Sequence, residues 1–204
     1  MKYFSDVNWL WYDKSSREFT KRCIIRLNVF EGCLLWKYIK KTEGDVIEIG
    51  RLHGGSTILI SEALSDSKRK LHSIDPVNAI KPASTNNLNL KVDAGVVLDE
   101  CKTHIKENSS RINLIEMTSQ DAHEKIKFNN TDCIFIDGDH SYEGVKSDTE
   151  LYWKYLDMGG YMIYHDYLRT LKYGVFQFCN EWISQGYMEK IEHVESMAVF
   201  QKIK

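Results

Sequence analysis

DCIFIDGDH at residues 132–140 and GGYMIYHDY at residues 159–167 are the two stretches that decide the fold of this chain. Each is a short apolar run that stops abruptly at acids and histidines. In an open parallel sheet the strands end along one edge, and ligands bind in the crevice outside their carboxyl ends. We therefore expect the polar residues that end these two runs to face a ligand.

Strand and helix patterns alternate on either side of these stretches. Strand patterns occupy residues 46–49, 70–75, 112–117, 132–136 and 161–164, and helical patterns occupy residues 56–64, 92–107, 120–127, 142–156 and 173–185. Upstream, apolar residues from Phe19 to Tyr38 recur at steps of three or four, which predicts an amphipathic helix within residues 16–40. In the helix at 142–156 we expect Asp148 and Glu150 on the solvated face. This alternation is typical of a doubly wound parallel sheet.

The last two strand patterns differ from the rest. Residues 188–194 and 197–203 are separated only by Glu195 and Ser196, and so short a connection joins only antiparallel neighbours. The predicted fold class is therefore α/β: a doubly wound, Rossmann-like, mostly parallel seven-stranded sheet with a C-terminal antiparallel hairpin strand. We predict one domain over residues 1–204, with an N-terminal helical segment at 1–43 and the ligand-binding core at 44–204.

The composition is that of an ordinary globular protein. The chain carries 27 basic and 29 acidic residues, mixed along the sequence, so it has no basic field with which to bind nucleic acid. No apolar stretch approaches the roughly 18 residues of a membrane span, and the start lacks the pattern of a secretory signal. The five cysteines form no C-x-x-C pair. We expect buried reduced thiols, a cytoplasmic location and no membrane partner.

A glycine-rich turn follows the first strand, at residues 50–55. Glycines there permit a tight turn and a close approach of the backbone to a ligand. The spacing differs from the dinucleotide fingerprint, which would require glycine where the chain has Leu52, and this disfavours a nicotinamide cofactor. Asp75 ends the second strand, where an acid can accept hydrogen bonds from ribose hydroxyls or cap the turn before Pro76. Beside the glycine turn, the ribose interpretation is favoured.

Five short motifs follow one another along the chain. They are Glu48-x-Gly50-x-x-x-Gly54-Gly55-Ser56, Ser73-Ile74-Asp75, Thr118-Ser119-Gln120-Asp121, Phe135-Ile136-Asp137-Gly138-Asp139-His140, and Gly159-Gly160 running into His165-Asp166-Tyr167. In this order they resemble the class I S-adenosylmethionine (SAM)-dependent methyltransferases, above all the catechol O-methyltransferase-like, macrolide-sugar and cephalosporin-type O-methyltransferase families. The resemblance covers roughly residues 44–167.

The resemblance implies a binding site for SAM. The residues that it assigns to this cofactor are Glu48, Gly50, Gly54, Gly55, Ser56, Asp75, Ser119, Gln120 and Asp137. The glycine turn would hold the methionine end, Asp75 the ribose, and Ser119 with Gln120 the adenine. A serine before a helical segment is also a common helix cap, and Ser119 could serve both purposes.

The resemblance also implies Mg²⁺ or another divalent cation, held by Asp137, His165 and Asp166. Histidine stands at 165 where the family usually has an acid, and hard cations prefer oxygen ligands. His165 could instead orient another ligand, bind a softer ion or transfer protons. His140 matches the general base of the macrolide-sugar enzymes, and its ordinary pKa near neutrality suits that task. The candidate catalytic residues are therefore His140 and His165.

The function predicted from these motifs is SAM-dependent methyl transfer to a hydroxyl of a small molecule, such as a sugar, nucleotide-sugar or natural product. A phenol loses its proton near pH 10, judging from tyrosine, and a sugar hydroxyl is more reluctant, so a divalent metal or a histidine base is needed. The alternatives are a metal-independent N- or carboxyl-methyltransferase and a non-catalytic nucleotide-binding module on the same fold. The expected partner is the hydroxyl acceptor, and a homo-oligomer stays open.

Overall fold

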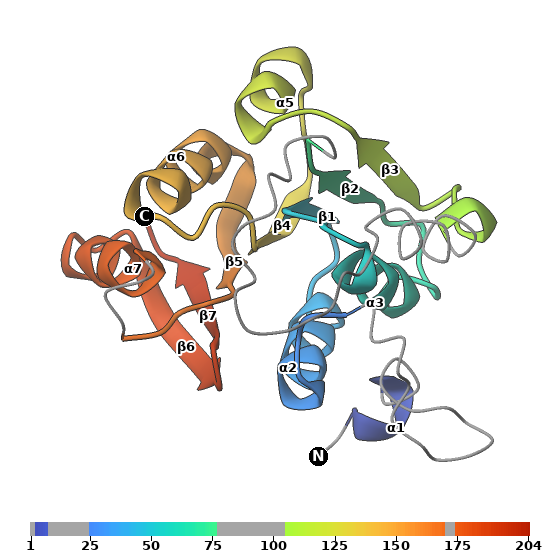
Figure 1. Cartoon of the computed structure of the whole chain (residues 1–204), viewed down its shortest axis with the longest axis horizontal. Coiled ribbons are helices and arrows are strands. Elements are labelled where there is room, and N and C mark those ends of the chain that lie inside the picture. Colours follow the sequence, from blue (N-terminus) through green and yellow to red (C-terminus); the bar gives the residue numbers. More distant parts are fainter. Residues whose placement is uncertain (1–2, 8–24, 77–104, 170–173) are drawn as a thin grey trace, which may run out of the picture.

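The computed structural model describes residues 3–7, 25–76, 105–169 and 174–204, which form one sheet with helices on both faces (Figure 1). The seven strands lie in the order β3-β2-β1-β4-β5-β7-β6. Their bounds are β1 Asp45–Ile49, β2 Leu71–Ile74, β3 Ile112–Ile115, β4 Thr131–Ile136, β5 Leu156–Tyr164, β6 Met188–Val194 and β7 Met197–Lys202. Strands β1 to β5 are parallel, whereas β7 is antiparallel to both β5 and β6. The predicted fold class is confirmed, including the hairpin at the sheet edge.

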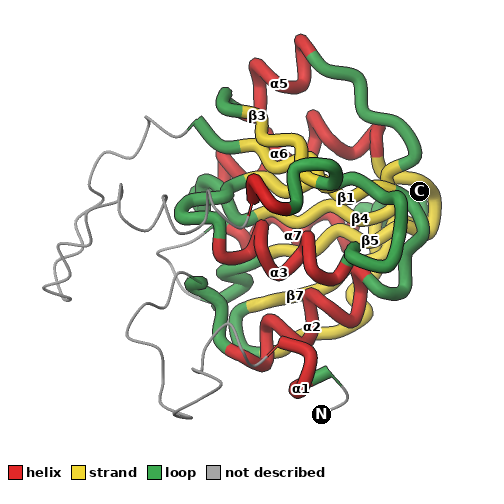
Figure 2. The backbone as a smooth tube through the Cα atoms, turned by 90° about the vertical axis from the view of Figure 1, so that its right-hand side faces the viewer, coloured by secondary structure: helices red, strands yellow, loops and turns green. Residues whose placement is uncertain are grey.

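The helices cover the two faces of this sheet. They are α1 Phe4–Val7, α2 Val29–Ile39, α3 Gly55–Ala63, α5 Ser119–Lys125, α6 Tyr142–Tyr152, the 3-10 helix η2 Trp153–Tyr155, and α7 Val175–Ser184. Figure 1 shows α2 and α3 on one side of the sheet and α5, α6 and α7 on the other. Figure 2, turned by 90°, shows the strands side by side through the middle of the molecule.

Successive residues of the central strands pack against opposite layers of helices. In β1, Val46 belongs to the apolar cluster that includes α2 and α3, while Ile47 belongs to the cluster that includes α5, α6 and α7. Both side chains are fully buried, and such burial contributes about 1.5–3 kcal/mol for each large aliphatic side chain. Because β1 is packed on both faces, the position of the turn that follows it is fixed.

Helix α2 begins later than the sequence predicted. Within the described residues, the expected helix over 16–40 is helical only from Val29. Asn28 ends the irregular segment before it, because its side chain accepts hydrogen bonds from the backbone of Phe30 and Glu31. The Glu31 side chain accepts from the Asn28 backbone in return, which completes a capping box. Phe30, expected on the buried stripe, is 44% exposed.

Other expectations differ at their edges or fall outside the described residues. The predicted helix at 92–107 lies mostly outside them, and only residues 105–107 of it are described, as helical. Strand β5 starts at Leu156, ahead of Gly159 and Gly160, because Leu156 pairs with Thr131 of β4 and the extra residues of β5 form an irregularity before Tyr161 pairs with Cys133. Buried thiols are confirmed for Cys33, Cys133 and Cys179, whereas Cys23 and Cys101 lie outside the described residues.

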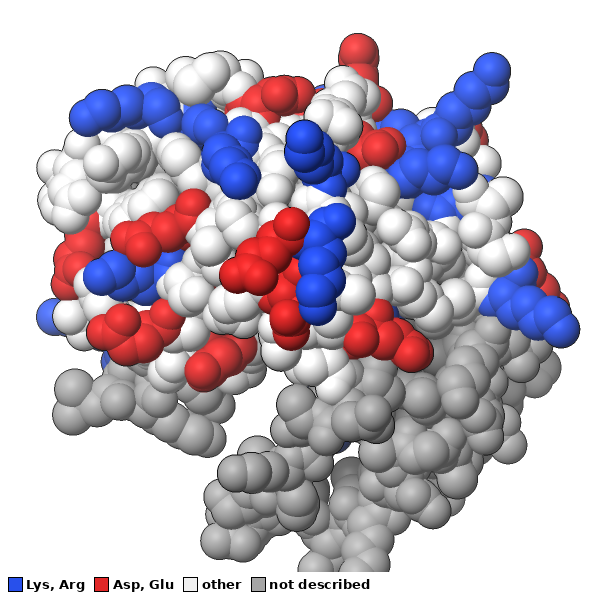
Figure 3. Space-filling view, turned by 90° about the horizontal axis from the view of Figure 1, so that it is seen from above, with Lys and Arg blue, Asp and Glu red and all other residues white. Residues whose placement is uncertain are grey.

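Charges of both signs are spread over the surface of the described residues. On the face shown in Figure 3, acidic and basic side chains lie among uncharged ones. Among the helices that the structure describes, none is long and apolar enough to cross a membrane.

Gly50, directly after β1, lies close against the backbone of Asp137, directly after β4. Its φ is +91°, and a Cβ there would lie 2.2 Å from the carbonyl oxygen of Asp137. Gly186 offers a matched comparison, because its φ is +75° but a Cβ would meet nothing within 4 Å.

We predict that Gly50→Ala destabilises the protein by about 2–5 kcal/mol, the sum of left-handed strain and overpacking against the backbone. Gly186→Ala should cost only the strain, about 1–2 kcal/mol. Urea denaturation of both variants measures the difference. Equal losses would contradict the close approach of β1 to β4.

Candidate functional site

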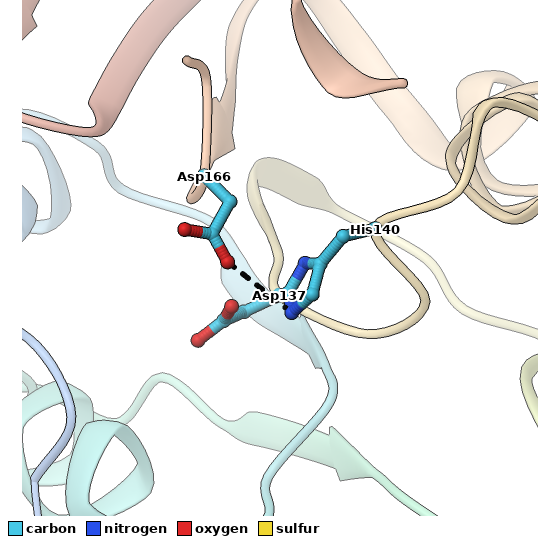
Figure 4. A group of neighbouring side chains, drawn as sticks. All are labelled: Asp137, His140 and Asp166. Carbon is cyan, nitrogen blue, oxygen red and sulfur yellow. Dashed lines mark ion pairs between the residues drawn. The ribbon is translucent and has the colours of Figure 1, made fainter. Parts of the chain in front are cut away.

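Three side chains with metal-binding and acid–base chemistry converge where β4 and β5 end. Asp137 directly follows β4, His140 lies in the loop before α6, and Asp166 follows β5 (Figure 4). His140 Nε2 lies 3.3 Å from Asp166 Oδ2, and one ligand atom of each of the three residues lies within 4.8 Å of the others. All three are partly exposed, so a ligand can reach them. We call Asp137, His140 and Asp166 the acid–histidine group.

Backbone contacts hold both sides of this group. Asp166 has a φ of 53°, an unusual conformation for a residue other than glycine, of the kind that persists at functional sites. The next residue, Tyr167, donates its backbone N–H to the Ser196 carbonyl at 2.8 Å. On the other side, the His140 carbonyl accepts from the Gly174 backbone at the start of α7, also at 2.8 Å. The β6–β7 turn and α7 therefore fix the two loops.

His165 lies beside the acid–histidine group but outside it. Its Nδ1 is 3.1 Å from Asp137 Oδ1, and its Nε2 is 3.1 Å from Ser196 Oγ and 3.6 Å from Glu31 Oε2. Burial alone would lower the pKa of His165, but the hydrogen bonds with Asp137 and Glu31 outweigh it and raise the pKa to about 10. Both ring nitrogens are thus engaged by protein groups. Among the described residues, the candidate metal ligands that converge are Asp137, His140 and Asp166. The sequence had predicted His165 as the histidine of this set.

Glu31 is a site residue that the sequence did not single out. Its carboxylate is 3% exposed and accepts hydrogen bonds from the Asn28 backbone and from the Ser196 backbone and hydroxyl, at 2.8, 2.9 and 2.5 Å. Burial would raise the pKa of Glu31, but hydrogen bonds from His165, Ser196 and Asn28 lower it to about 2. The capping box was a readable local signal, but no local pattern predicts a contact with His165.

The glycine turn lies beside this group on the same edge of the sheet, at the end of β1, which is the neighbour of β4. Glu48, predicted to contact a ligand, is fully buried behind the turn, and burial raises its pKa. Its two oxygens accept from the hydroxyls of Ser56, Thr57 and Ser73 at 2.5–2.6 Å. Glu48 therefore fastens α3 and β2 behind the turn, and the Ser56 hydroxyl points to it.

The contacts of Asp75 are compatible with its predicted role of accepting hydrogen bonds from ribose hydroxyls. Its Oδ2 accepts from the backbone of Arg51 and Leu52, both at 2.9 Å, while no described residue donates to Oδ1. Leu52 has a φ of 47°, and His53 has a buried Nδ1 without a hydrogen-bond partner among the described residues. Gly54 begins α3 with a φ of 88°. A strained loop with unused polar atoms fits a ligand that supplies their partners.

Ser119 is not the residue that caps helix α5. The cap of α5 is Thr118, whose side chain accepts from the Asp121 backbone, so the capping alternative for Ser119 is wrong. Ser119 is the first residue of α5, and its hydroxyl donates to a carboxylate oxygen of Asp148 on α6. Gln120 donates to the Ser147 hydroxyl at 3.1 Å. The two predicted adenine residues thus face the middle of α6.

Asp148 is buried, and its expected place on a solvated helix face is wrong. It is 4% exposed, on the same side of α6 as the buried Val145, Thr149 and Tyr152. The spacing of these residues was a signal in the sequence, because Asp148 falls on their helical stripe. Burial raises the pKa of Asp148 to about 6, although the hydrogen bond from Ser119 opposes this.

Comparison with known proteins matches a family model described as a methyltransferase domain over residues 47–167. A curated relative, an uncharacterized protein of Acanthamoeba polyphaga mimivirus, is 26% identical over 139 residues, which are 63% of this chain and 53% of that protein. The chain thus spans about half the length of this relative.

Several solved structures share the fold. The O-methyltransferase NovP is 15% identical with a TM-score of 0.68, over 92% of this chain and 86% of NovP. An O-methyltransferase from Bacillus cereus, solved in complex with SAH, is 18% identical with a TM-score of 0.59, over 87% of this chain and 82% of that one. TomG from Streptomyces achromogenes, an O-methyltransferase in complex with SAM, is 12% identical with a TM-score of 0.59 over the same shares.

We predict a specific pH dependence of stability for Asp148. Its pKa is raised from 3.8 to about 6 in the folded state, so the folded protein binds more protons than the unfolded chain between these values. Stability relative to Asp148→Asn should therefore fall as pH rises from 4 to about 6, by about 3 kcal/mol in all, at 1.36 kcal/mol per unit. Urea denaturation of both proteins across this range measures the fall. A constant difference would show that Asp148 is not buried.

Proposed function

The chain belongs to the methyltransferase-domain family, whose model matches more than half of it, and on that premise we propose that it transfers the methyl group of SAM to a hydroxyl of a small molecule. One observation carries this proposal: the acid–histidine group lies at the ends of β4 and β5, on the same sheet edge as the glycine turn and Asp75. The arrangement thus provides one place for a nucleoside and another for proton transfer.

The residues beside β1 and β2 fit SAM. The Oδ1 of Asp75, to which no described residue donates, can accept from the ribose hydroxyls, and the glycine turn at residues 50–55 leads directly into the start of α3. When bound, SAM supplies a methyl group on a positively charged sulfur. The B. cereus and TomG structures contain SAH and SAM on the same fold, which supports this assignment.

His140 is the residue that we propose to accept the proton of the acceptor hydroxyl. Asp166, 3.3 Å from its Nε2, holds the ring and stabilises the positive charge that the ring gains. Much of the remaining task is positioning, because the acceptor oxygen must lie in line with the methyl carbon.

Asp137, His140 and Asp166 also fit a divalent cation, which supplies positive charge that favours an ionised hydroxyl. Two carboxylates suit Mg²⁺, and the imidazole extends the choice to Mn²⁺ and similar ions. One imidazole nitrogen cannot bind a cation and accept a proton at the same time, so the roles of ligand and base compete if both use the same nitrogen of His140. The acceptor class that we propose is a sugar, nucleotide-sugar or polyhydroxylated natural product.

We predict that Asp75→Asn weakens SAM binding about 10- to 100-fold, because the amide replaces a charged acceptor of hydrogen bonds. Asp66→Asn is the matched control, since Asp66 is an exposed acid paired with Lys40. Isothermal titration calorimetry with SAM measures both affinities. The proposal is contradicted if the parent protein binds another nucleotide but not SAM, or if both variants bind SAM like the parent.

We predict that His140→Ala reduces methyl transfer from labelled SAM about 100- to 10,000-fold, with SAM affinity unchanged. The exposed His193→Ala is the control and should transfer at the parent rate. Mn²⁺ affinity measured by calorimetry then separates the metal-ligand role from the base role, because only the ligand role predicts that His140→Ala also weakens Mn²⁺ binding. Turnover that survives complete chelation would refute a role for the cation in methyl transfer. Equal rates in His140→Ala and the parent would remove His140 from the mechanism.

A further inference from the structure

Glu31 connects three parts of the chain that are distant in sequence. It lies in the first turn of α2, its partner Ser196 lies in the turn between β6 and β7, and both contact His165 at the end of β5. None of the three belongs to the acid–histidine group. His165 in turn contacts Asp137 of that group.

The contacts of Glu31 exceed what helix capping requires. One oxygen, Oε2, accepts from the Asn28 backbone and lies 3.6 Å from His165 Nε2. The other, Oε1, accepts from both the backbone and the hydroxyl of Ser196. A capping residue at this position is normally at the surface, whereas a buried carboxylate is costly unless it is paired. The burial of Glu31 at 3% exposed therefore needs a reason other than the cap.

Fastening α2 to the C-terminal hairpin is not that reason, because a second carboxylate already does so. Glu192 on β6 accepts from Lys37 at 2.5 Å and from Tyr38 at 2.8 Å, both on α2. Glu192 has no contact with His165 among the described residues. The two glutamates thus perform the same structural task, and only Glu31 also reaches the site.

His165 is held from both sides by these contacts. Its Nε2 faces Glu31 and Ser196, and its Nδ1 lies 3.1 Å from Asp137 Oδ1. A ring fixed at one nitrogen can fix a carboxylate at the other, in the way that partners behind metal ligands orient those ligands. With one oxygen directed to His165, the rotation of the Asp137 carboxylate is set.

We propose that Glu31 and Ser196 are positioning residues that hold His165 against Asp137 and thereby orient the Asp137 carboxylate toward the acid–histidine group. The inference rests on the proposed function, in which that group binds a divalent cation. In this proposal His165 orients a metal ligand, which is one of the roles that the sequence left open. The residues that hold His165 in place come from α2 and from the β6–β7 turn.

The test compares Glu31→Gln and Ser196→Ala with Glu192→Gln in the full chain. Glu31→Gln should weaken Mn²⁺ binding about 10- to 100-fold by calorimetry, and Ser196→Ala should weaken it less, while SAM affinity stays at the parent value. Glu192→Gln should lower thermal stability less than Glu31→Gln does, because the Glu192 side chain is 33% exposed, and should leave Mn²⁺ affinity unchanged. Parent-like Mn²⁺ binding in Glu31→Gln, or an equal loss in Glu192→Gln, would overturn the proposal.

A second measurement does not depend on the cation. In a crystal structure of Glu31→Gln we expect His165 Nδ1 to move away from Asp137 Oδ1, which it approaches to 3.1 Å in the parent. An unchanged distance would refute the positioning role even if the parent bound no Mn²⁺. Failure of the proposed function would appear separately, as absence of SAM binding or of Mn²⁺ binding by the parent protein.

Discussion

The parallel alignment of β1, β2, β4 and β5 is the constraint on which the site depends. Backbone hydrogen bonds of the sheet continue one residue beyond the strands: Gly50 donates to Ile74 at 2.9 Å, Asp137 to Ile49 at 2.8 Å, and His165 to Ile136 at 3.1 Å. The backbone of Gly50, Asp137 and His165 is therefore anchored to the neighbouring strand at the point where each strand ends. Since β1 and β4 lie side by side in the middle of the sheet, the two halves of the site meet at the point where strand order reverses.

Buried charge is managed differently in the two halves. Behind the glycine turn, the fully buried Glu48 accepts hydrogen bonds from three hydroxyl groups, and no charged group among the described residues lies at hydrogen-bond distance from it. Behind the acid–histidine group, Glu31 is instead balanced by His165, whose pKa is raised to about 10. The hydroxyl groups around Glu48 fix the glycine turn, whereas the ionic pair of Glu31 and His165 also places a charge next to Asp137. This difference suits a nucleoside on one side and a cation or proton on the other.

The candidate site residues that were easiest to place from the sequence are those at or just after the end of a strand. Asp75, Asp137 and Asp166 were readable because an apolar run that ends in an acid marks a strand tip, whatever the rest of the fold. Asp148 was misplaced because a charge in a helix was assigned to solvent, although the stripe of Val145 and Thr149 placed it inside. The start of α2 was missed because apolar spacing alone does not show where a helix is capped.

The contacts made by Glu31 could not be predicted, since they join residues more than 100 positions apart through a turn and a helix cap. Periodicity describes which face of an element is buried but not which buried polar groups meet. The parallel sheet was accessible from the alternation of elements, whereas the meeting of α2, the β6–β7 turn and β5 depends on packing of the whole sheet. The sequence also did not show that His140, and not His165, lies with Asp137 and Asp166 in the acid–histidine group.

A crystal structure of the chain with S-adenosylhomocysteine, the demethylated product of SAM, is the most direct measurement of whether one ligand spans both halves of the site. We expect the ribose hydroxyls at Asp75 Oδ1, the adenine near Ser119, and the sulfur directed toward Asp137, His140 and Asp166. Density for the ligand elsewhere, or an Asp75 Oδ1 that faces another protein group in the complex, would contradict a cofactor lying across the ends of β1, β2 and β4.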